Sequence, residues 1–120
     1  MSLRNMRRIS KRALNPLLSS PRICARAGEN SCKGRLTIEH VFIYGGKQID
    51  ETWSLLWLCA YHHGVDQYQD CGDLRKELNQ FLALMAATDD DLAKYPKKDW
   101  TQLKKYLAVK YGTYNRGAGR

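Results

Sequence analysis

The sequence predicts a small α+β domain in which two short strands and a helix are held together by a bound metal ion, with a basic arm before them and further helices after them. Three observations lead to this prediction. The chain has 120 residues, which is room for one domain with a limited core. A segment of alternating polarity and an apolar segment, separated by a glycine pair, are typical of two strands. Four cysteines and three histidines indicate a metal that would stabilise so small a core.

The first 22 residues are predicted to be a basic arm rather than part of the core. Residues 7–14 could form two helical turns. Asn15-Pro16 would end them, because the residue before a proline disfavours the helical conformation. Residues 19–21, Ser-Ser-Pro, are typical of a linker. Residues 23–120 are therefore expected to form a single domain.

Two strands and a helix are expected in the middle of the chain. Residues 35–39 alternate between apolar and polar side chains, which predicts a strand. Gly45-Gly46 breaks this pattern, and a loop is predicted from there to about residue 52. Residues 53–59 form a short apolar run typical of a buried strand. A helix is expected to begin near Tyr61 or His62.

Three more helices are predicted from residue 73 onward. Asp73 is a candidate N-cap of the first, Thr88 and Asp91 resemble a capping box at the start of the second, and Asp99 is a candidate N-cap of the third. Residues 73–112 thus form supporting helices. Their apolar stripes, which we assign to core packing, are Leu74, Leu78, Phe81, Leu82 and Met85 in the first helix and Trp100, Leu103, Leu107 and Tyr111 in the third.

The net charge of +8 is distributed unevenly along the chain. Residues 1–35 carry nine Lys/Arg against one acidic residue, and residues 92–120 carry eight against one. Residues 36–91 carry three basic residues against ten acidic ones, together with all three histidines. Basic ends suit contacts with the phosphates of DNA, and an acidic centre suits a bound cation. The alternative is that the termini are only solvated.

The cysteines predict a structural zinc site. No apolar run approaches the roughly 20 residues of a membrane span, and the basic N-terminus lacks the apolar region of a secretory signal. We therefore expect a cytoplasmic protein, in which cysteines more often bind metal than form disulfides. Cys59 and His62 have a spacing that lets both reach one tetrahedral ion. Cys24 and Cys32 would complete the set.

Two alternatives to this zinc set stay open. Cys71 could replace Cys32, although we expect Cys71 to be free or in the core. The cysteines could also be isolated buried thiols beside a packed histidine.

The remaining histidines predict a second, open metal site. His40 follows Glu39 at the end of the first strand, and His63 lies about 100° around the helix from His62, so it can face away from the zinc. Neutral His40 can act as a general base, and Glu39, His63 and Gln67 or Asp66 can hold a divalent cation such as Mg²⁺. Together these groups suit phosphodiester hydrolysis.

These residues resemble the HNH endonuclease motif of the His-metal finger nucleases. The resemblance covers residues 24–70, from the cysteine pair through Leu36-Thr-Ile-Glu-His40 and Gly45-Gly46 to Ser54-Leu-Leu-Trp-Leu-Cys59-Ala-Tyr-His62-His63. It implies a ββα-metal core with His40 as general base, Glu39 and His63 as ligands of the catalytic cation, and a structural zinc. It also implies cleavage of DNA that leaves 5′-phosphate and 3′-hydroxyl ends.

The chain departs from the family pattern at two places. Ser54 stands where the family has its middle Asn, which stabilises the loop between the strands or helps at the metal, and Glu39 replaces the commoner Asp. A compact basic chain of this kind also resembles phage or prophage recombination nucleases, which implies a bacterial cytoplasm. Double-strand cutting by so small a unit suggests a homodimer.

Two other classes of function remain open at this point. The chain could be a non-catalytic zinc module that binds nucleic acid, an interpretation favoured by Ser54. Alternatively, its basic termini could dock on a protein partner, and the zinc would then be only structural.

Overall fold

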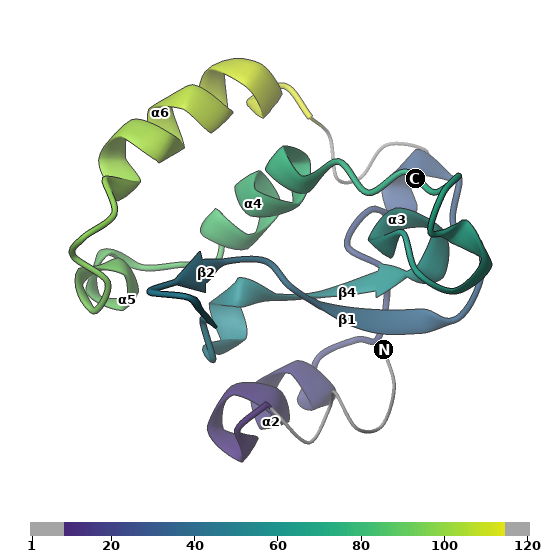
Figure 1. The fold of residues 1–120 in the computed structure, drawn as a ribbon, viewed down its shortest axis with the longest axis horizontal. Helices are drawn as coiled ribbons and strands as arrows, with labels where there is room; N and C mark the ends of the chain where they lie inside the picture. Colours follow the sequence, from purple (N-terminus) through teal and green to yellow (C-terminus); the bar gives the residue numbers. More distant parts are fainter. Residues whose placement is uncertain (1–8, 115–120) are drawn as a thin grey trace.

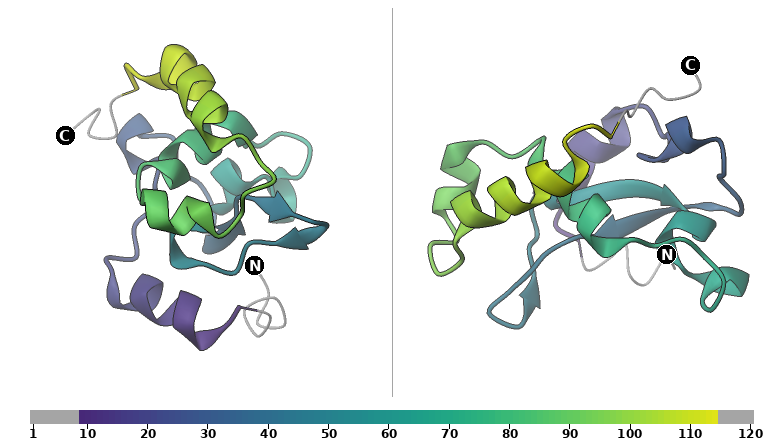
Figure 2. Two further views of the ribbon diagram at one scale, coloured as in Figure 1. Left: turned by 90° about the vertical axis from the view of Figure 1, so that its left-hand side faces the viewer. Right: turned by 90° about the horizontal axis from the view of Figure 1, so that it is seen from above.

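The computed structural model, which describes residues 9–114, shows a central pair of strands between helices (Figure 1). Strands β1 (Leu36–His40) and β4 (Leu55–Cys59) are antiparallel, with Leu36 opposite Cys59 and His40 opposite Leu55. Helix α2 (Lys11–Ser19) lies on one side of this pair and α4 (Lys76–Leu84) on the other (Figures 1 and 2). The chain is a small α+β fold, as the sequence predicts.

The two faces of the β1–β4 pair have different neighbours because successive side chains of a strand point to opposite faces. Ile38 and Leu55 pack against the buried residues Ile9, Ala13 and Leu17. On the other face, the buried residues Leu56, Leu58, Leu78 and Leu82 form a cluster that joins β4 to α4. By alternation, Thr37 and Glu39 lie on this second face, opposite Leu58 and Leu56.

Helix α2 differs from the predicted N-terminal arm. It begins at Lys11, after Ser10 accepts a hydrogen bond from the backbone N–H of Ala13, and it runs through Pro16. The proline costs about 3 kcal/mol within a helix. Burial of Ala13 and Leu17 offsets this cost, since one large apolar side chain contributes about 1.5–3 kcal/mol. The predicted stop at Asn15-Pro16 is therefore wrong, and Ile9, Ala13 and Leu17 of this segment belong to the core. Residues 1–8 of the predicted arm lie outside the described residues.

A second hairpin occupies the segment that was predicted as a loop. Strand β2 (Ile43–Tyr44) pairs with β3 (Lys47–Gln48). Gly45 and Gly46 form the turn with φ of 59° and 80°, and such left-handed turns match the twist of a hairpin. A 3₁₀ turn, η2 (Thr52–Ser54), then precedes β4. Trp53 and Ser54, which were predicted to begin the strand, lie in this turn instead.

Helix α3 (Ala60–His63) has a single turn and follows β4 directly. It ends at Gly64, whose φ of 68° lies in the left-handed region that favours glycine. A 3₁₀ turn, η3 (Asp66–Tyr68), follows. Another 3₁₀ turn, η1 (Ala27–Glu29), lies in the segment between Cys24 and Cys32.

The C-terminal helices confirm two of the three predicted caps. Thr88 and Asp91 form a reciprocal capping box at α5 (Asp89–Ala93), and Asp99 accepts a hydrogen bond from Gln102 at the start of α6 (Trp100–Tyr111). The prediction for Asp73 is wrong. Helix α4 begins after Arg75, which has φ of 41° and makes no side-chain cap. The Asp73 carboxylate instead pairs with two arginines, Arg26 and Arg75.

An aromatic cluster closes the end of the molecule formed by the second hairpin, α5 and α6. Phe42, Trp53 and Trp100 contact one another, with ring centroids 5.3–5.9 Å apart. This cluster packs with the buried residues Leu84, Leu92 and Leu107 and so fixes α5 and α6 to the rest of the fold. Within residues 9–114, no helix is long and apolar enough to cross a membrane.

Candidate functional site

Four metal-ligating side chains meet where β4 joins α3. They are Cys24, Cys32, Cys59 and His62, and their ligand atoms all lie within 4.8 Å of one another. Cys59 is the last residue of β4 and His62 lies in the following turn. Cys24 reaches them because the backbone N–H of Ala25 bonds to the carbonyl of Trp57 at 2.7 Å. The sequence prediction of this set is confirmed as a cluster that could hold a metal ion.

The spacing of the four ligand atoms fits a tetrahedral ion. The Nδ1 atom of His62 lies 3.5 Å from the sulfur of Cys24, 3.8 Å from that of Cys32 and 3.2 Å from that of Cys59. Ligands at the usual zinc distances of about 2.1 and 2.3 Å are separated by about 3.6 Å at the tetrahedral angle. The imidazole therefore points its Nδ1 atom at the place an ion would occupy.

The electrostatics of the cluster favour a cation. Desolvation and repulsion from Cys24 raise the pKa of Cys32 to about 12. Desolvation also acts on Cys59, but backbone hydrogen bonds from His62 and Lys33 outweigh it and lower the pKa of Cys59. Burial and the nearby Arg26 guanidinium lower the pKa of His62, which keeps its ring neutral and able to ligate. Three thiolates can coexist here only with the charge of a bound ion.

A buried charge network supports the other nitrogen of His62. Its Nε2 atom lies 3.0 Å from the Ser31 hydroxyl and 3.7 Å from Glu29. Glu29 in turn pairs with Arg26, whose side chain is fully buried and also donates to the backbone carbonyls of Asp73 and Leu74. Such partners orient a metal-bound imidazole. They also tie the metal cluster to the segment that leads into α4.

Two neighbouring groups do not belong to the cluster. Cys71 is exposed, its thiol donates a hydrogen bond to the carbonyl of Gln67 at 3.6 Å, and its sulfur is not among the clustered ligand atoms, so it neither replaces Cys32 nor lies in the core. Glu29 and Asp73 lie close enough to His62 to form a second set of ligand atoms. Both carboxylates are paired with arginines, so we assign them to the support of His62 rather than to a second ion.

His63 faces away from the cysteines, as its position in the helix predicts. Its Nδ1 atom lies 2.6 Å from the Thr37 hydroxyl, and its Nε2 atom lies 3.5 Å from Oε1 of Glu39. Thr37 donates its single hydrogen to the carbonyl of Leu58 at 2.7 Å, so the Nδ1–H of His63 must donate to Thr37. The Nε2 lone pair of the neutral ring therefore faces the Glu39 carboxylate.

Because the Nε2 lone pair of His63 and the Glu39 carboxylate are both acceptors, a positive charge is required between them. Either a second proton on the ring or a cation bound to both groups would supply it. Two ligands about 2.1 Å from one cation are separated by about 3.0 Å at a right angle and about 3.4 Å at the tetrahedral angle. The observed 3.5 Å is close to this range. Glu39 and His63 are 17% and 14% exposed, so solvent can reach them.

His40 lines a cavity of about 180 Å³ beside Glu39. The other walls come from the second hairpin and from α4, through Val41, Ile43, Gln48, Lys76 and Asn79. Burial lowers the pKa of His40; attraction to Glu39 and Asp50 acts against this effect, and repulsion from His63 adds to it. The ring is therefore neutral at pH 7 and can accept a proton.

Ser54 lies outside this cavity and supports the chain that follows His40. Its buried hydroxyl accepts a hydrogen bond from the N–H of Phe42 at 3.3 Å, and its carbonyl accepts one from Val41 at 2.9 Å. Ser54, which stands at the place of the family's middle Asn, thus fixes the segment that follows His40.

The third predicted cation ligand is not brought to the site. Because α3 ends at Gly64, Gln67 does not lie one turn further along the helix of His63, and its side chain is exposed. Asp66 is exposed and pairs with Arg35 at 2.7 Å. Among residues 9–114, no hydrogen bond or ion pair joins Gln67 or Asp66 to Glu39 or His63.

Sequence reasoning missed three sets of residues around these sites. Thr37, which fixes the His63 ring, stands two residues before Glu39, and the period of a strand could have placed both on one face. Asn79 and Lys76 come from α4, far along the chain, and only the tertiary fold brings them to His40. Arg26 is fully buried, which its charge gave no reason to expect.

Comparisons with protein-family models, with curated proteins and with solved structures found no match for this chain. The fold and the site define the class: a small α+β protein with a Cys₃His cluster able to hold a metal ion. A histidine–carboxylate pair lies beside that cluster, on the other side of α3.

Proposed function

We propose that this chain is a metal-dependent endonuclease of the HNH kind, with zinc in the Cys₃His cluster and a second divalent cation at Glu39 and His63. The observation that carries the proposal is the state of His63. Its Nδ1–H is committed to Thr37, and its Nε2 lone pair faces a carboxylate 3.5 Å away. Histidines that ligate catalytic metals are commonly held in this way by a hydrogen bond to the other nitrogen.

The donor sets fit two different ions. Three cysteines and one histidine make a closed tetrahedral set, which is typical of structural zinc. One carboxylate and one imidazole leave most positions of an ion open to water and phosphate, which suits Mg²⁺, Mn²⁺ or Ni²⁺. The open ion would supply charge neutralisation at the scissile phosphate and the leaving oxygen.

His40 supplies the base in this proposal. Its lowered pKa leaves it neutral at pH 7, and it lines a cavity next to Glu39. A water molecule held there would transfer a proton to His40 as its oxygen bonds to phosphorus. The bond from phosphorus to the 3′ oxygen would break, and that oxygen would take a proton from solvent. The products would be a 5′-phosphate and a 3′-hydroxyl, as the HNH resemblance implies.

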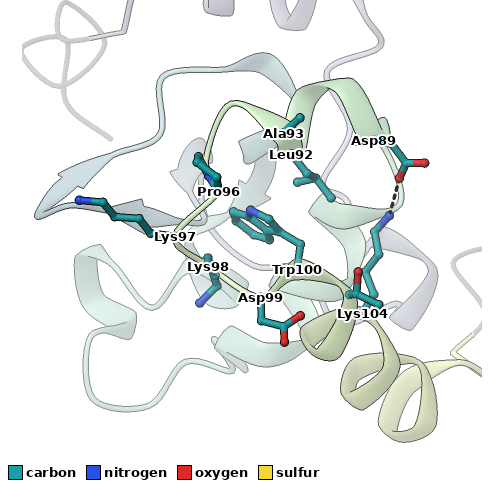
Figure 3. A pocket seen from close by; sticks show the side chains of 10 residues that line it. Asp89, Leu92, Ala93, Pro96, Lys97, Lys98, Asp99, Trp100 and Lys104 are labelled. Atoms are coloured by element: carbon teal, nitrogen blue, oxygen red, sulfur yellow. Dashed lines mark ion pairs between the residues drawn. The ribbon is translucent and has the colours of Figure 1, made fainter.

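Basic side chains on the second half of the fold suit a nucleic-acid partner. Lys97, Lys98 and Lys104 line a cavity of about 540 Å³ between α5 and α6, and Figure 3 shows how they surround Trp100. Lys104 pairs with Asp89 at 3.8 Å. The N–H of Lys97 donates to the Tyr44 hydroxyl, which places this surface next to the second hairpin. Phosphates could therefore be bound on both sides of that hairpin.

The proposal is tested by incubating plasmid DNA with the zinc-loaded protein and added Mg²⁺, Mn²⁺ or Ni²⁺. We expect nicked plasmid with at least one of these ions, and loss of nicking in His40→Ala with zinc content and DNA binding unchanged. Gln67→Ala is the matched control, because Gln67 is exposed and should leave nicking intact.

Two results would contradict the proposal. Equal nicking by parent and His40→Ala would remove His40 from the mechanism. DNA binding without any nicking would leave the non-catalytic zinc module as the better description.

A further inference from the structure

The second hairpin, β2–β3, projects from the body of the molecule, as the right-hand view of Figure 2 shows. Its two strands pair only with each other among the residues that the structure describes. A Cβ atom added at Gly45 or Gly46 would meet no other atom within 4 Å, so the turn lies in open solvent. The hairpin is therefore a free two-stranded ribbon that a partner can reach.

The base of the hairpin is held firmly by the core. Phe42 and Ile49 are each 2% exposed, and the N–H of Ile49 donates to the carbonyl of Phe42 at 2.9 Å. The Tyr44 ring packs against Tyr95 with centroids 5.1 Å apart, and its hydroxyl accepts a hydrogen bond from the N–H of Lys97. The direction of the ribbon is thus fixed before a partner binds, which lowers the entropic cost of binding.

The two faces of the hairpin have different neighbours. Residues opposite each other in an antiparallel pair point to the same face. Ile43 lies opposite Gln48, and both line the cavity that His40 also lines. Tyr44 lies opposite Lys47, and Tyr44 contacts the segment between α5 and α6. The ribbon therefore has the His40 cavity on one side and the α5–α6 lysines on the other.

The exposed side chains of the hairpin suit the edges of base pairs. Ile43 is 66% exposed, and Lys47 and Gln48 are also exposed. The side chains of Lys47 and Gln48 make no hydrogen bond or ion pair with another residue in the range 9–114. In the major groove of DNA, a glutamine amide pairs with adenine, a lysine binds guanine, and an apolar side chain contacts the thymine methyl group.

The dimensions of the hairpin fit the same groove. The turn lies three residues beyond the buried base at Phe42, which is about 10 Å at the rise of a strand. The major groove is about 8.5 Å deep and about 12 Å wide and admits a two-stranded ribbon, whereas the minor groove is only about 6 Å wide. The ribbon is thus long enough for the major groove and too wide for the minor groove.

Positive charge lies where one edge of that groove would be. The ammonium groups of Lys97 and Lys98 form no ion pair within residues 9–114, and both residues line the α5–α6 cavity. Two carboxylates share this cavity, but Asp89 pairs with Lys104 and Asp99 caps α6. Free ammonium groups beside an exposed ribbon are complementary to a row of phosphates.

We infer that the second hairpin lies in the major groove of duplex DNA, with Ile43, Lys47 and Gln48 against the base pairs. The phosphates along one edge of the groove then face the His40 cavity, and those along the other edge face the α5–α6 lysines. This inference deepens the proposed nuclease function and rests on DNA being its substrate. It also names the substrate class, because a single strand has no second edge and the major groove of duplex RNA is too narrow for a ribbon.

The deciding experiment is methylation footprinting of a DNA duplex with dimethyl sulfate, without added divalent cation. This reagent methylates guanine N7 in the major groove and adenine N3 in the minor groove, so one reaction reports both grooves. We expect the parent to protect guanine N7 atoms and Ile43→Ser/Gln48→Ala to lose this protection. The matched control is Val109→Ser/Gln102→Ala on α6, which also replaces an exposed aliphatic residue and an exposed glutamine and should keep it.

Binding measurements on the same proteins test the inference a second way. Ile43→Ser/Gln48→Ala should lower duplex affinity by about tenfold, the effect expected for lost groove contacts. The slope of log affinity against log salt should not change, because no charge is removed. Parent protein should bind the DNA duplex more tightly than the single strand or an RNA duplex of the same sequence, a comparison that needs no variant to fold.

The failure of this inference can be told apart from the failure of the nuclease proposal. Guanine protection that persists in Ile43→Ser/Gln48→Ala, or protection of adenine N3 alone, would overturn the groove contact even if the parent nicks plasmid. Equal affinity for duplex and single strand would overturn it as well. Guanine protection by a protein that never nicks DNA would keep the groove contact and reject the nuclease.

Discussion

Replacing Glu29 by glutamine tests whether the buried charge network behind His62 stabilises the fold. Glu29 accepts hydrogen bonds from Arg26, Arg75 and Tyr114. Burial acts to raise its pKa, but these bonds and the two arginine charges outweigh it and lower the pKa of Glu29 to about 2 from an ordinary 4.5. A tenfold change in the acid dissociation constant corresponds to about 1.4 kcal/mol. The lowered pKa of Glu29 therefore corresponds to at most about 3 kcal/mol in the free energy of unfolding. Solvent screening at a side chain that is 16% exposed reduces this to about 2 kcal/mol.

The sign of the pH dependence follows from the lowered pKa. A carboxylate with a lower pKa in the folded state contributes stability that is fully present above its unfolded value, and this is lost as the pH falls from about 4.5 towards 2. At pH 7, Glu29→Gln should therefore lower the free energy of unfolding by about 2 kcal/mol. Below about pH 2 the difference from the parent should largely disappear.

Urea unfolding of the zinc-saturated protein, followed by tryptophan fluorescence, measures this difference. Glu77→Gln is the matched control, because Glu77 pairs with Lys110 at the surface with side chains 41% and 48% exposed. Solvent screens such an exposed pair, so it contributes little to stability. Equal losses in the two variants at pH 7 would refute the argument that burial of Arg26 makes Glu29 important.

Three further predictions concern the metals and the base. Cys59→Ala should lose its bound zinc, as measured by elemental analysis. It should also lose cooperative unfolding, because metal binding and folding are coupled in so small a domain. A folded, zinc-free variant would be inconsistent with the role of the cluster. Thr37→Val removes the hydrogen bond to the His63 ring and should weaken Mn²⁺ binding by about 10–100-fold in a calorimetric titration. The control Thr52→Val, on η2, should leave Mn²⁺ affinity unchanged. Equal affinities in the two variants would show that Thr37 does not orient a ligand. Nicking activity should rise with pH through a midpoint below 6.5, because His40 has a lowered pKa and acts unprotonated. Asp50→Asn should move this midpoint lower, because it removes an attraction that raises the pKa of His40. A midpoint that stays in place in Asp50→Asn would exclude His40 as the titrating group.

Local signals in the sequence were sufficient for several elements. The capping box of Thr88 and Asp91 and the cap at Asp99 were predictable because each depends on two or three neighbouring residues. The metal cluster was predictable because Cys59 and His62 are separated by one helical turn. The separation of His62 and His63 onto two sides of α3 followed from helix geometry alone.

Features that depend on distant contacts were not predictable in this way. Pro16 stays inside α2 because Leu17 is buried against the sheet, and Asp73 leaves its expected capping position because Arg26 and Arg75 bind its carboxylate. Gln67 failed as a ligand because Gly64 ended α3 after a single turn. The contribution of α4 to the His40 cavity required the packing of Leu78 and Leu82 on β4, and no short motif encodes it.

We expect Glu39 and His63 to share a divalent cation next to His40. An anomalous-scattering map of crystals grown with Mn²⁺ and a short DNA duplex, collected at the manganese edge, tests it most directly. We predict one manganese peak between Oε1 of Glu39 and Nε2 of His63, with a DNA phosphate on the side of His40. A map with no manganese at this position, and a direct ion pair between the two side chains instead, would contradict the account.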